Sequence, residues 1–182
     1  MTRSTASPSR ARLEVVLPDE DATTALGENL ARAIRNESVA IEVGGLAIAL
    51  TGELGAGKTA LVRALLRGSG VTGSVKSPTF TLLEPYDISR LHFYHFDFYR
   101  FKAPEEFADS GFSEYFGPAA VCLVEWPERA GSYLPPVDLR IALSMSESGH
   151  GERAAAVDAN TEVGARCLAH LETLQTATRV DA

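Results

Sequence analysis

Residues 52–59 read GELGAGKT and match the phosphate-loop pattern, in which glycines lead into a Lys followed by Thr or Ser. Glycine lets backbone N–H groups curl around an anion because it has no Cβ atom in the way. The Lys58 ammonium can then bridge the outer phosphates of a nucleotide, and the Thr59 hydroxyl can bind Mg²⁺. The expected nucleotide contacts in this loop are Gly52, Glu53, Leu54, Gly55, Ala56, Gly57, Lys58 and Thr59.

Nucleotide hydrolysis also needs a carboxylate near Mg²⁺ and a group that positions the attacking water. Glu125 follows the apolar run 119–124, so it supplies an acid at the tip of a buried strand, where Asp is more usual. Asp97, within HFYHFDFYR at 92–100, is the second candidate. Spacing alone does not decide which of the two binds the metal. Trp126, the only Trp, could contact adenine or belong to the core.

Asp97 has other interpretations. In an extended strand it shares a face with His95 and Tyr99. A carboxylate among aromatic residues needs a partner, and an ion pair with Arg100 or another Arg would give it a structural role. His95 and Asp97 could also bind a transition metal, although no third ligand follows at a convincing spacing.

Ser77-Pro78-Thr79-Phe80 lies between the phosphate loop and these acids. GTPase-type switch segments occupy this region and use a Thr to sense the γ-phosphate. Thr79 could do so, as could Ser77, and a simple turn explains the pattern equally well.

Apolar spacing predicts the elements that carry these residues. We expect an edge strand at 13–17, a helix after the acidic residues 19–21, and two strands at 39–43 and 46–50 around a Gly44-Gly45 hairpin turn. A helix capped by Gly68 follows the phosphate loop, and a β-rich stretch at 79–101 is broken near Pro85. Further expected elements are a helical segment at 104–116, a buried strand at 119–124, an edge strand at 139–143 and a closing helix at 161–174.

These elements predict an α/β protein with a P-loop NTPase fold: a central, mostly parallel or mixed sheet, flanked by helices, with antiparallel edge strands. Residues 1–12 have almost nothing to bury and are expected to form a disordered tail, with a single domain over 13–182. The 14 aromatic residues all lie between Phe80 and Tyr133, so they form either the bulky part of a core or a stacking platform for bases.

The composition is that of a globular protein, with 45% apolar and 23% charged residues among 182. The net charge of −7 disfavours nucleic-acid binding unless positive charge is gathered locally. Residues 58–102 carry seven basic and three acidic side chains, which keeps an RNA-binding module as an alternative. Cys122 and Cys167 are too far apart in sequence to suggest a disulfide framework or a zinc site. Without a membrane-spanning run or secretory signal, we expect a cytoplasmic protein.

Six segments resemble the TsaE (YjeE) family, in the family's order and over roughly residues 13–145. The combination of SPTF at 77–80, H-x-D-x-Y-R at 95–100 and VEWP at 124–127 is far more specific than the phosphate loop. The matching segments lie at 17–27, 52–59, 75–82, 84–86, 94–100 and 123–128.

The resemblance implies a P-loop fold that binds Mg²⁺ and ATP, with Thr59 and Glu125 as metal ligands and Asp97 as a catalytic acid near the metal and the γ-phosphate. It makes residues 77–80 a switch-like loop. Around the base and ribose it implies Glu20, Thr23, Trp126 and Glu128. The sequence after about Met145 is weakly patterned, so no functional residue is carried over from the family to that part.

The family's ATPase is weak alone and is stimulated by the TsaD–TsaB pair, which transfers threonylcarbamoyl to the tRNA adenosine beside the anticodon. The resemblance therefore implies ATP turnover that resets this complex, with only indirect involvement of tRNA. A small-molecule or nucleotide kinase is the alternative. A kinase usually has an Arg-rich lid, but no Arg cluster follows the loop helix and residues 104–116 are acidic.

Overall fold

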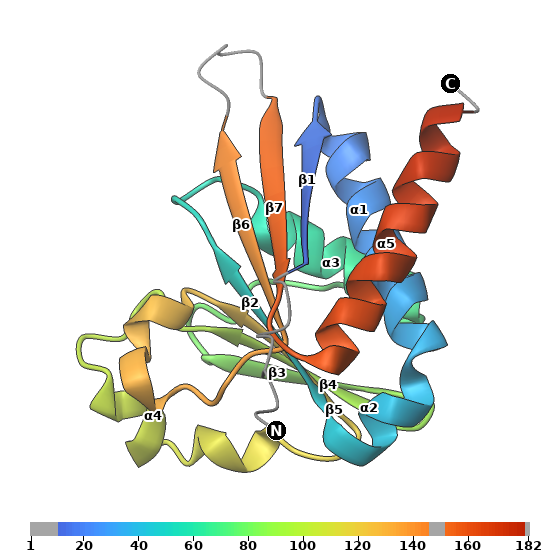
Figure 1. Ribbon diagram of the computed structural model, residues 1–182. Helices are drawn as coiled ribbons and strands as arrows, with labels where there is room; N and C mark the ends of the chain where they lie inside the picture. Colours follow the sequence, from blue (N-terminus) through green and yellow to red (C-terminus); the bar gives the residue numbers. More distant parts are fainter. Residues whose placement is uncertain (1–10, 146–151, 181–182) are drawn as a thin grey trace, which may run out of the picture.

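The computed structural model describes residues 11–145 and 152–180, and it contains a seven-stranded mixed sheet in the order β1-β7-β6-β2-β5-β4-β3 (Figure 1). The four central strands, β6, β2, β5 and β4, are parallel, whereas the β1–β7, β7–β6 and β3–β4 pairs are antiparallel. The strands are β1 Arg12–Leu17, β2 Leu46–Thr51, β3 Leu83–Ile88, β4 Leu91–Asp97, β5 Ala120–Glu125, β6 Leu139–Met145 and β7 Arg153–Ala159. This arrangement confirms the predicted fold class.

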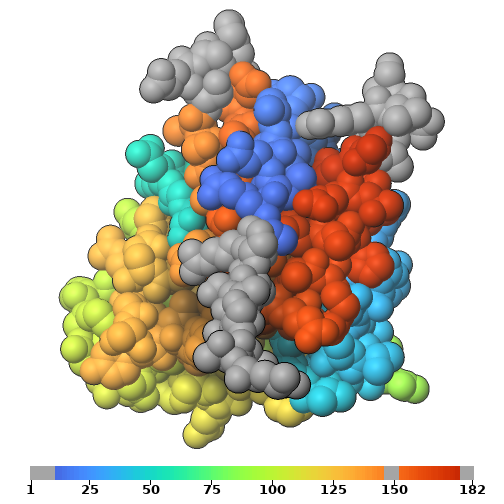
Figure 2. Space-filling view, viewed as in Figure 1, coloured from blue at the N-terminus to red at the C-terminus, as the bar shows by residue number. Residues whose placement is uncertain are grey.

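Helices cover both faces of the sheet. They are α1 Glu20–Asn36, α2 Ser38–Gly44, α3 Lys58–Ser69, α4 Glu105–Asp109 and α5 Glu162–Val180, with short 3₁₀ turns at 112–115, 127–129 and 131–133. The carboxylate of Asp19 accepts a hydrogen bond from the Ala22 N–H at 2.7 Å and so caps α1. Figure 2 shows α5 and β1 side by side on one face of the molecule. Within the described residues, no helix combines the length and the apolar character needed to cross a membrane.

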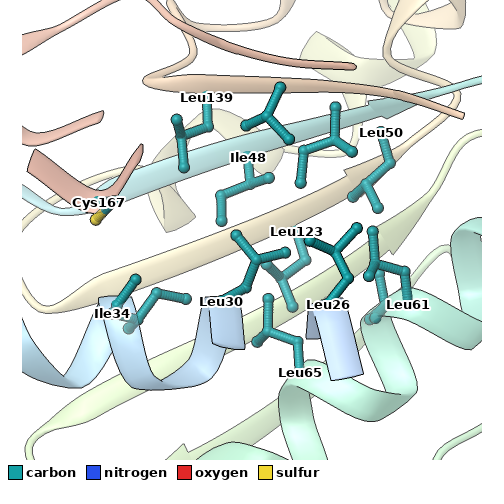
Figure 3. Packing of buried hydrophobic residues seen from close by; sticks show 14 of the residues in the cluster. Leu26, Leu30, Ile34, Ile48, Leu50, Leu61, Leu65, Leu123, Leu139 and Cys167 are labelled. Carbon is teal, nitrogen blue, oxygen red and sulfur yellow. The ribbon is translucent and has the colours of Figure 1, made fainter. Parts of the chain in front are cut away.

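The larger core lies between one sheet face and the helices α1, α3 and α5. Leu26 and Leu30 of α1 and Leu61 and Leu65 of α3 point toward β2 and β5 (Figure 3). The two helices approach closely at Gly27, where a Cβ atom would lie 2.5 Å from the Cβ of Ala64. This close contact holds α3, and with it the phosphate loop, against the sheet.

The opposite face carries a core of aromatic rings, and its members are Phe96, Phe98, Phe101, Phe107 and Phe112. Phe98 and Phe101 stack with their ring centroids 4.6 Å apart. Six of the 14 aromatic residues are buried and four more are partly buried, so most of them contribute to the core and not to an exposed base-stacking platform. Phe80 is an exception, since 83% of it is exposed.

The strand predicted at 39–43 and the hairpin turn at Gly44-Gly45 are wrong, whereas the strand predicted at 46–50 is confirmed as β2. Residues 38–44 form the helix α2, in which only Ile41 is buried. Gly45 ends the helix at φ 77° and donates its N–H to the Ile41 carbonyl. A strand would bury Val39, Ile41 and Val43 on one face, but Val39 and Val43 are exposed, so the β-branched residues do not decide the local structure here.

Two predicted breaks are also displaced. Helix α3 continues through Gly68, which packs against α1, and is capped by Gly70 at φ 116°. Pro85 lies inside β3, where an edge strand tolerates proline, and the chain turns instead at Ser89-Arg90. The segment predicted as helical at 104–116 is divided at Gly111, with φ 69°, into α4 and a 3₁₀ turn.

The C-terminal third contains a strand that the sequence analysis missed. Strand β7 follows β6, so β6 lies inside the sheet and not at its edge as predicted. Small Ala residues give β7 little hydrophobic contrast, which explains why its pattern is weak. Strand β1 begins at Arg12, within the predicted tail, and residues 1–10 of that tail lie outside the described residues.

Candidate functional site

The phosphate loop connects the end of β2 to the start of α3, at the centre of the sheet. Gly52, Gly55 and Gly57 adopt φ angles of 139°, 83° and 103°, which other residues rarely adopt. A Cβ atom on Gly52 would also collide with the carbonyl oxygen of Leu143 in β6. The loop shape therefore depends on glycine at these positions, and residues 57–60, at the start of α3, line a cavity.

Lys58 points into this loop and is only 4% exposed. Its Nζ donates hydrogen bonds to the carbonyl oxygens of Gly52 at 2.7 Å and Glu53 at 2.9 Å. The Trp126 ring lies over the ammonium, with its centroid 3.8 Å from Nζ. Burial lowers the pKa of Lys58, and the carboxylates of Glu125, Glu128 and Asp97 partly oppose that change.

Glu125 ends β5, which lies between β2 and β4, so its carboxylate is placed beside the phosphate loop. The Thr59 hydroxyl lies 2.9 Å from one carboxylate oxygen of Glu125 and 3.0 Å from the other. A hydroxyl and a carboxylate held together at the start of α3 are the oxygen ligands that Mg²⁺ prefers beside phosphates.

Asp97 ends the neighbouring strand β4 and is the register partner of Glu125. Its Oδ2 accepts hydrogen bonds from the hydroxyls of Ser77 at 2.5 Å and Thr79 at 2.6 Å. The other oxygen accepts from the Tyr99 N–H at 3.0 Å. Asp97 is therefore tied to the segment 77–80, which the sequence analysis singled out as switch-like.

Neither alternative pairing of Asp97 occurs within the described residues. The guanidinium of Arg100 lies over the exposed Phe80 ring, 4.2 Å from its centroid, and makes no ion pair with Asp97 in the described structure. His95 turns to Glu125 instead, with 2.8 Å between its Nε2 and Oε1. Across residues 11–145 and 152–180, no three His, Cys, Asp or Glu residues converge as a metal-binding group. The donor set thus suits Mg²⁺ completed by phosphate oxygens, and it does not suit a protein-only metal site.

A cavity of about 410 Å³ joins these groups. The phosphate loop, Ser77 and Thr79, the two acids and Trp126 all line it. Its size is within the range of small-molecule sites. Leu54 at its edge is 70% exposed, as is most of Phe80 on the adjoining segment.

Arg153 also lines this cavity, and the sequence analysis missed it. It is the first residue of β7 and lies over the loop, so that a Cβ atom on Gly57 would be 3.4 Å from its Cδ and 3.5 Å from its Nε. This Nε is buried and has no hydrogen-bond partner among the described residues. The strand order puts Arg153 on the opposite side of β2 from both acids. A lone basic residue before a weak Ala-rich strand was the only sequence signal.

The residues expected around the base and ribose are placed differently from one another. Trp126 lines the cavity and packs against Tyr99, with 5.0 Å between the ring centroids. Its φ angle of 58° is unusual for so bulky a residue. Glu20 and Thr23 lie in the first turns of α1, outside the cavity lining, and the Thr23 hydroxyl donates to the Asp19 carbonyl oxygen. Glu128 is exposed and also lies outside the lining, although its charge acts on Lys58.

Comparison with known proteins points to one family. Residues 17–155 match the model for the TsaE family, described as threonylcarbamoyl adenosine biosynthesis protein TsaE. The tRNA threonylcarbamoyladenosine biosynthesis protein TsaE of Haemophilus influenzae is 48% identical over 92 residues, which cover 50% of this chain and 58% of that protein. The Bacillus subtilis protein of the same name is 38% identical over 122 residues, or 67% of this chain and 75% of that protein.

A solved structure agrees with these sequence matches. The crystal structure of Bacillus subtilis YdiB superposes with a TM-score of 0.68 at 30% identity, covering 97% of this chain and all of that one. The similarity thus extends beyond the phosphate loop to the whole sheet and its helices.

Proposed function

This chain belongs to the TsaE family of threonylcarbamoyl adenosine biosynthesis proteins, and on that premise we propose that it is a magnesium-dependent ATPase acting in tRNA threonylcarbamoyladenosine modification. The observation that carries the proposal is the contact between the Thr59 hydroxyl and the Glu125 carboxylate, beside a loop that buries Lys58. Hydroxyl, carboxylate and lysine are the three groups that a phosphate loop needs to bind a metal nucleotide.

The phosphates of ATP would bind to the N–H groups of the loop and to the start of α3, where the helix dipole favours negative charge. Lys58 would donate to phosphate oxygens with the N–H that its two carbonyl partners leave free. Arg153 would approach the phosphates from the side of the loop opposite the acids, and its unpartnered Nε supports this role. Lys58 and Arg153 together would offset the negative phosphate charge that Mg²⁺ leaves uncompensated.

Thr59 and Glu125 would hold Mg²⁺, which neutralises charge that develops on the phosphates during transfer. Asp97 would orient the attacking water, because it ends the strand next to Glu125. In the present arrangement the hydroxyls of Ser77 and Thr79 occupy one oxygen of Asp97. Movement of Ser77 and Thr79 away from Asp97, with Thr79 turning to the γ-phosphate, would free that oxygen. Basal activity would then be low, because it would depend on this movement of the segment 77–80.

We further propose that the TsaD–TsaB pair stimulates this activity by acting on the segment 77–80 and that tRNA is involved only through that pair. The exposed side chains of Phe80 and Leu54 beside the cavity support a protein contact at this end of the molecule. A partner that bound there would also reach the switch-like segment that holds Asp97.

The test is phosphate release from ATP by the purified chain, alone and with TsaD–TsaB. We expect slow release alone and much faster release with the pair, and both rates should fall about 100-fold or more in Glu125→Gln, which keeps the size of the side chain but removes its charge. Glu114→Gln, an exposed carboxylate far from the cavity lining, is the matched control and should leave both rates unchanged.

Two results would contradict the proposal. Efficient phosphoryl transfer to a small acceptor, without any response to TsaD–TsaB, would favour a kinase. Full activity of Glu125→Gln would instead remove Glu125 from the metal site and leave Asp97 as the metal ligand.

A further inference from the structure

We infer that His95 is a positioning residue that fixes the Glu125 carboxylate for metal binding, an inference that rests on the proposed function. His95 lies on β4 and is 0% exposed. Its Nε2 is 2.8 Å from Oε1 of Glu125, on the neighbouring strand. The proposed metal ligand, Glu125, is therefore hydrogen-bonded to the His95 ring, which does not itself line the cavity.

The direction of this hydrogen bond follows from the surroundings of the ring. Its other nitrogen, Nδ1, is buried and has no partner among the described residues. A proton on Nδ1 would leave a buried donor unsatisfied, which is costly, whereas a proton on Nε2 has an acceptor in Glu125. With its proton on Nε2, the ring thus donates to the carboxylate.

This hydrogen bond restricts the position of the Glu125 carboxylate. Oε1 lies between His95 Nε2 and the Thr59 hydroxyl, whereas Oε2 has the Thr59 hydroxyl, at 3.0 Å, as its only hydrogen-bond partner within the described part of the chain. A glutamate side chain has several rotatable bonds, and fixing it before the metal arrives removes an entropic cost from binding. In metal sites, loss of a hydrogen bond that orients a ligand typically weakens metal affinity about 10- to 100-fold.

Two amide substitutions separate positioning from filling of the core. His95→Gln places its amide N–H near the position of Nε2, so it can still donate to Glu125. His95→Asn has the same chemistry but reaches only as far as Nδ1, so it cannot. Phe93→Leu, a buried change two residues earlier on the same strand, is the control for loss of packing alone.

The experiment is calorimetric titration of each purified full chain with ADP, in excess EDTA and over a series of Mg²⁺ concentrations. Mg²⁺ is expected to tighten ADP binding, and we compare the Mg²⁺ concentration at which half of this effect is reached. For His95→Asn we expect this concentration to rise about 10- to 100-fold, while the ADP affinity measured in EDTA stays unchanged. His95→Gln should stay within a few-fold of the wild type. Phe93→Leu should lower the melting temperature without moving the Mg²⁺ dependence.

The outcomes distinguish this inference from the proposed function. A His95→Asn protein with wild-type Mg²⁺ dependence would overturn the positioning role while leaving the proposed function intact, and so would equal losses in His95→Asn and His95→Gln. A wild-type chain that binds no ADP, or binds it equally with and without Mg²⁺, would overturn the proposed metal nucleotide site and this inference together.

Discussion

Replacement of Lys58 by alanine tests the phosphate-binding role of the loop most directly. A buried charge pair that loses one partner typically costs about 2–5 kcal/mol of binding free energy. Here two of the three N–H donors of the ammonium already bond loop carbonyls, so phosphate adds fewer new hydrogen bonds than it would to a free ammonium. We therefore expect the lower part of that range, about 2–3 kcal/mol, or a loss of affinity for Mg-ADP of about 30- to 150-fold.

Calorimetric titration with Mg-ADP measures this loss. Lys102→Ala removes the same charge from an exposed position outside the cavity lining, and it reports how much of the change is long-range electrostatics. If Lys58→Ala bound Mg-ADP within threefold of the wild type, the phosphate-binding role of this loop would be refuted. Equal losses in the two variants would show that Lys58 acts through net charge and not through contact.

Two further predictions concern residues that the sequence analysis did not single out. Arg153→Gln should weaken Mg-ATP binding about tenfold, because it removes a cation from the cavity. The control Arg140→Gln, on the exposed side of β6, should not weaken it. Equal Mg-ATP affinities of the two variants in fluorescence titration would exclude Arg153 from the site. Burial raises the pKa of Glu37, but its hydrogen bonds to Arg166 and His170 outweigh this and lower the pKa below the ordinary 4.5. Because the folded-state pKa is depressed, the stability that ionised Glu37 provides is present above pH 4.5 and is lost as the pH falls through the lower folded-state value. In urea unfolding below pH 4.5, the free energy of unfolding of Glu37→Gln should therefore depend less on pH than that of the wild type.

The parts of the site that could be predicted are those whose geometry is local or follows from strand polarity. Gly52, Gly55 and Gly57 are adjacent in sequence, and their positive φ angles follow from the loop pattern. Glu125 and Asp97 were expected to lie together because parallel strands bring their carboxyl ends to one edge of the sheet, and the two residues are register partners. Their roles toward nucleotide and metal stay predictions.

Predictions made from the local sequence pattern were wrong where tertiary packing opposed that pattern. Val39, Ile41 and Val43 alternate as in a strand, yet the chain there is a helix that buries only Ile41. Gly68 resembles a helix end, but α3 continues through it, and glycine at this position permits the close approach of α1, where a Cβ atom would lie 3.0 Å from the Cβ of Ala31. In both cases the contacts come from residues that lie elsewhere in the chain.

The sequence by itself determined the phosphate loop, the acids at two strand ends and the family, because these depend on contiguous residues or on ordered motifs. The tertiary structure alone decided which side chains meet. His95 contacts Glu125 and not Asp97, Asp97 accepts from Ser77 and Thr79, and Arg153 reaches the loop almost 100 residues earlier in the chain. Such pairings depend on strand order and on the direction of each side chain, and both are set by packing between segments that are distant in sequence.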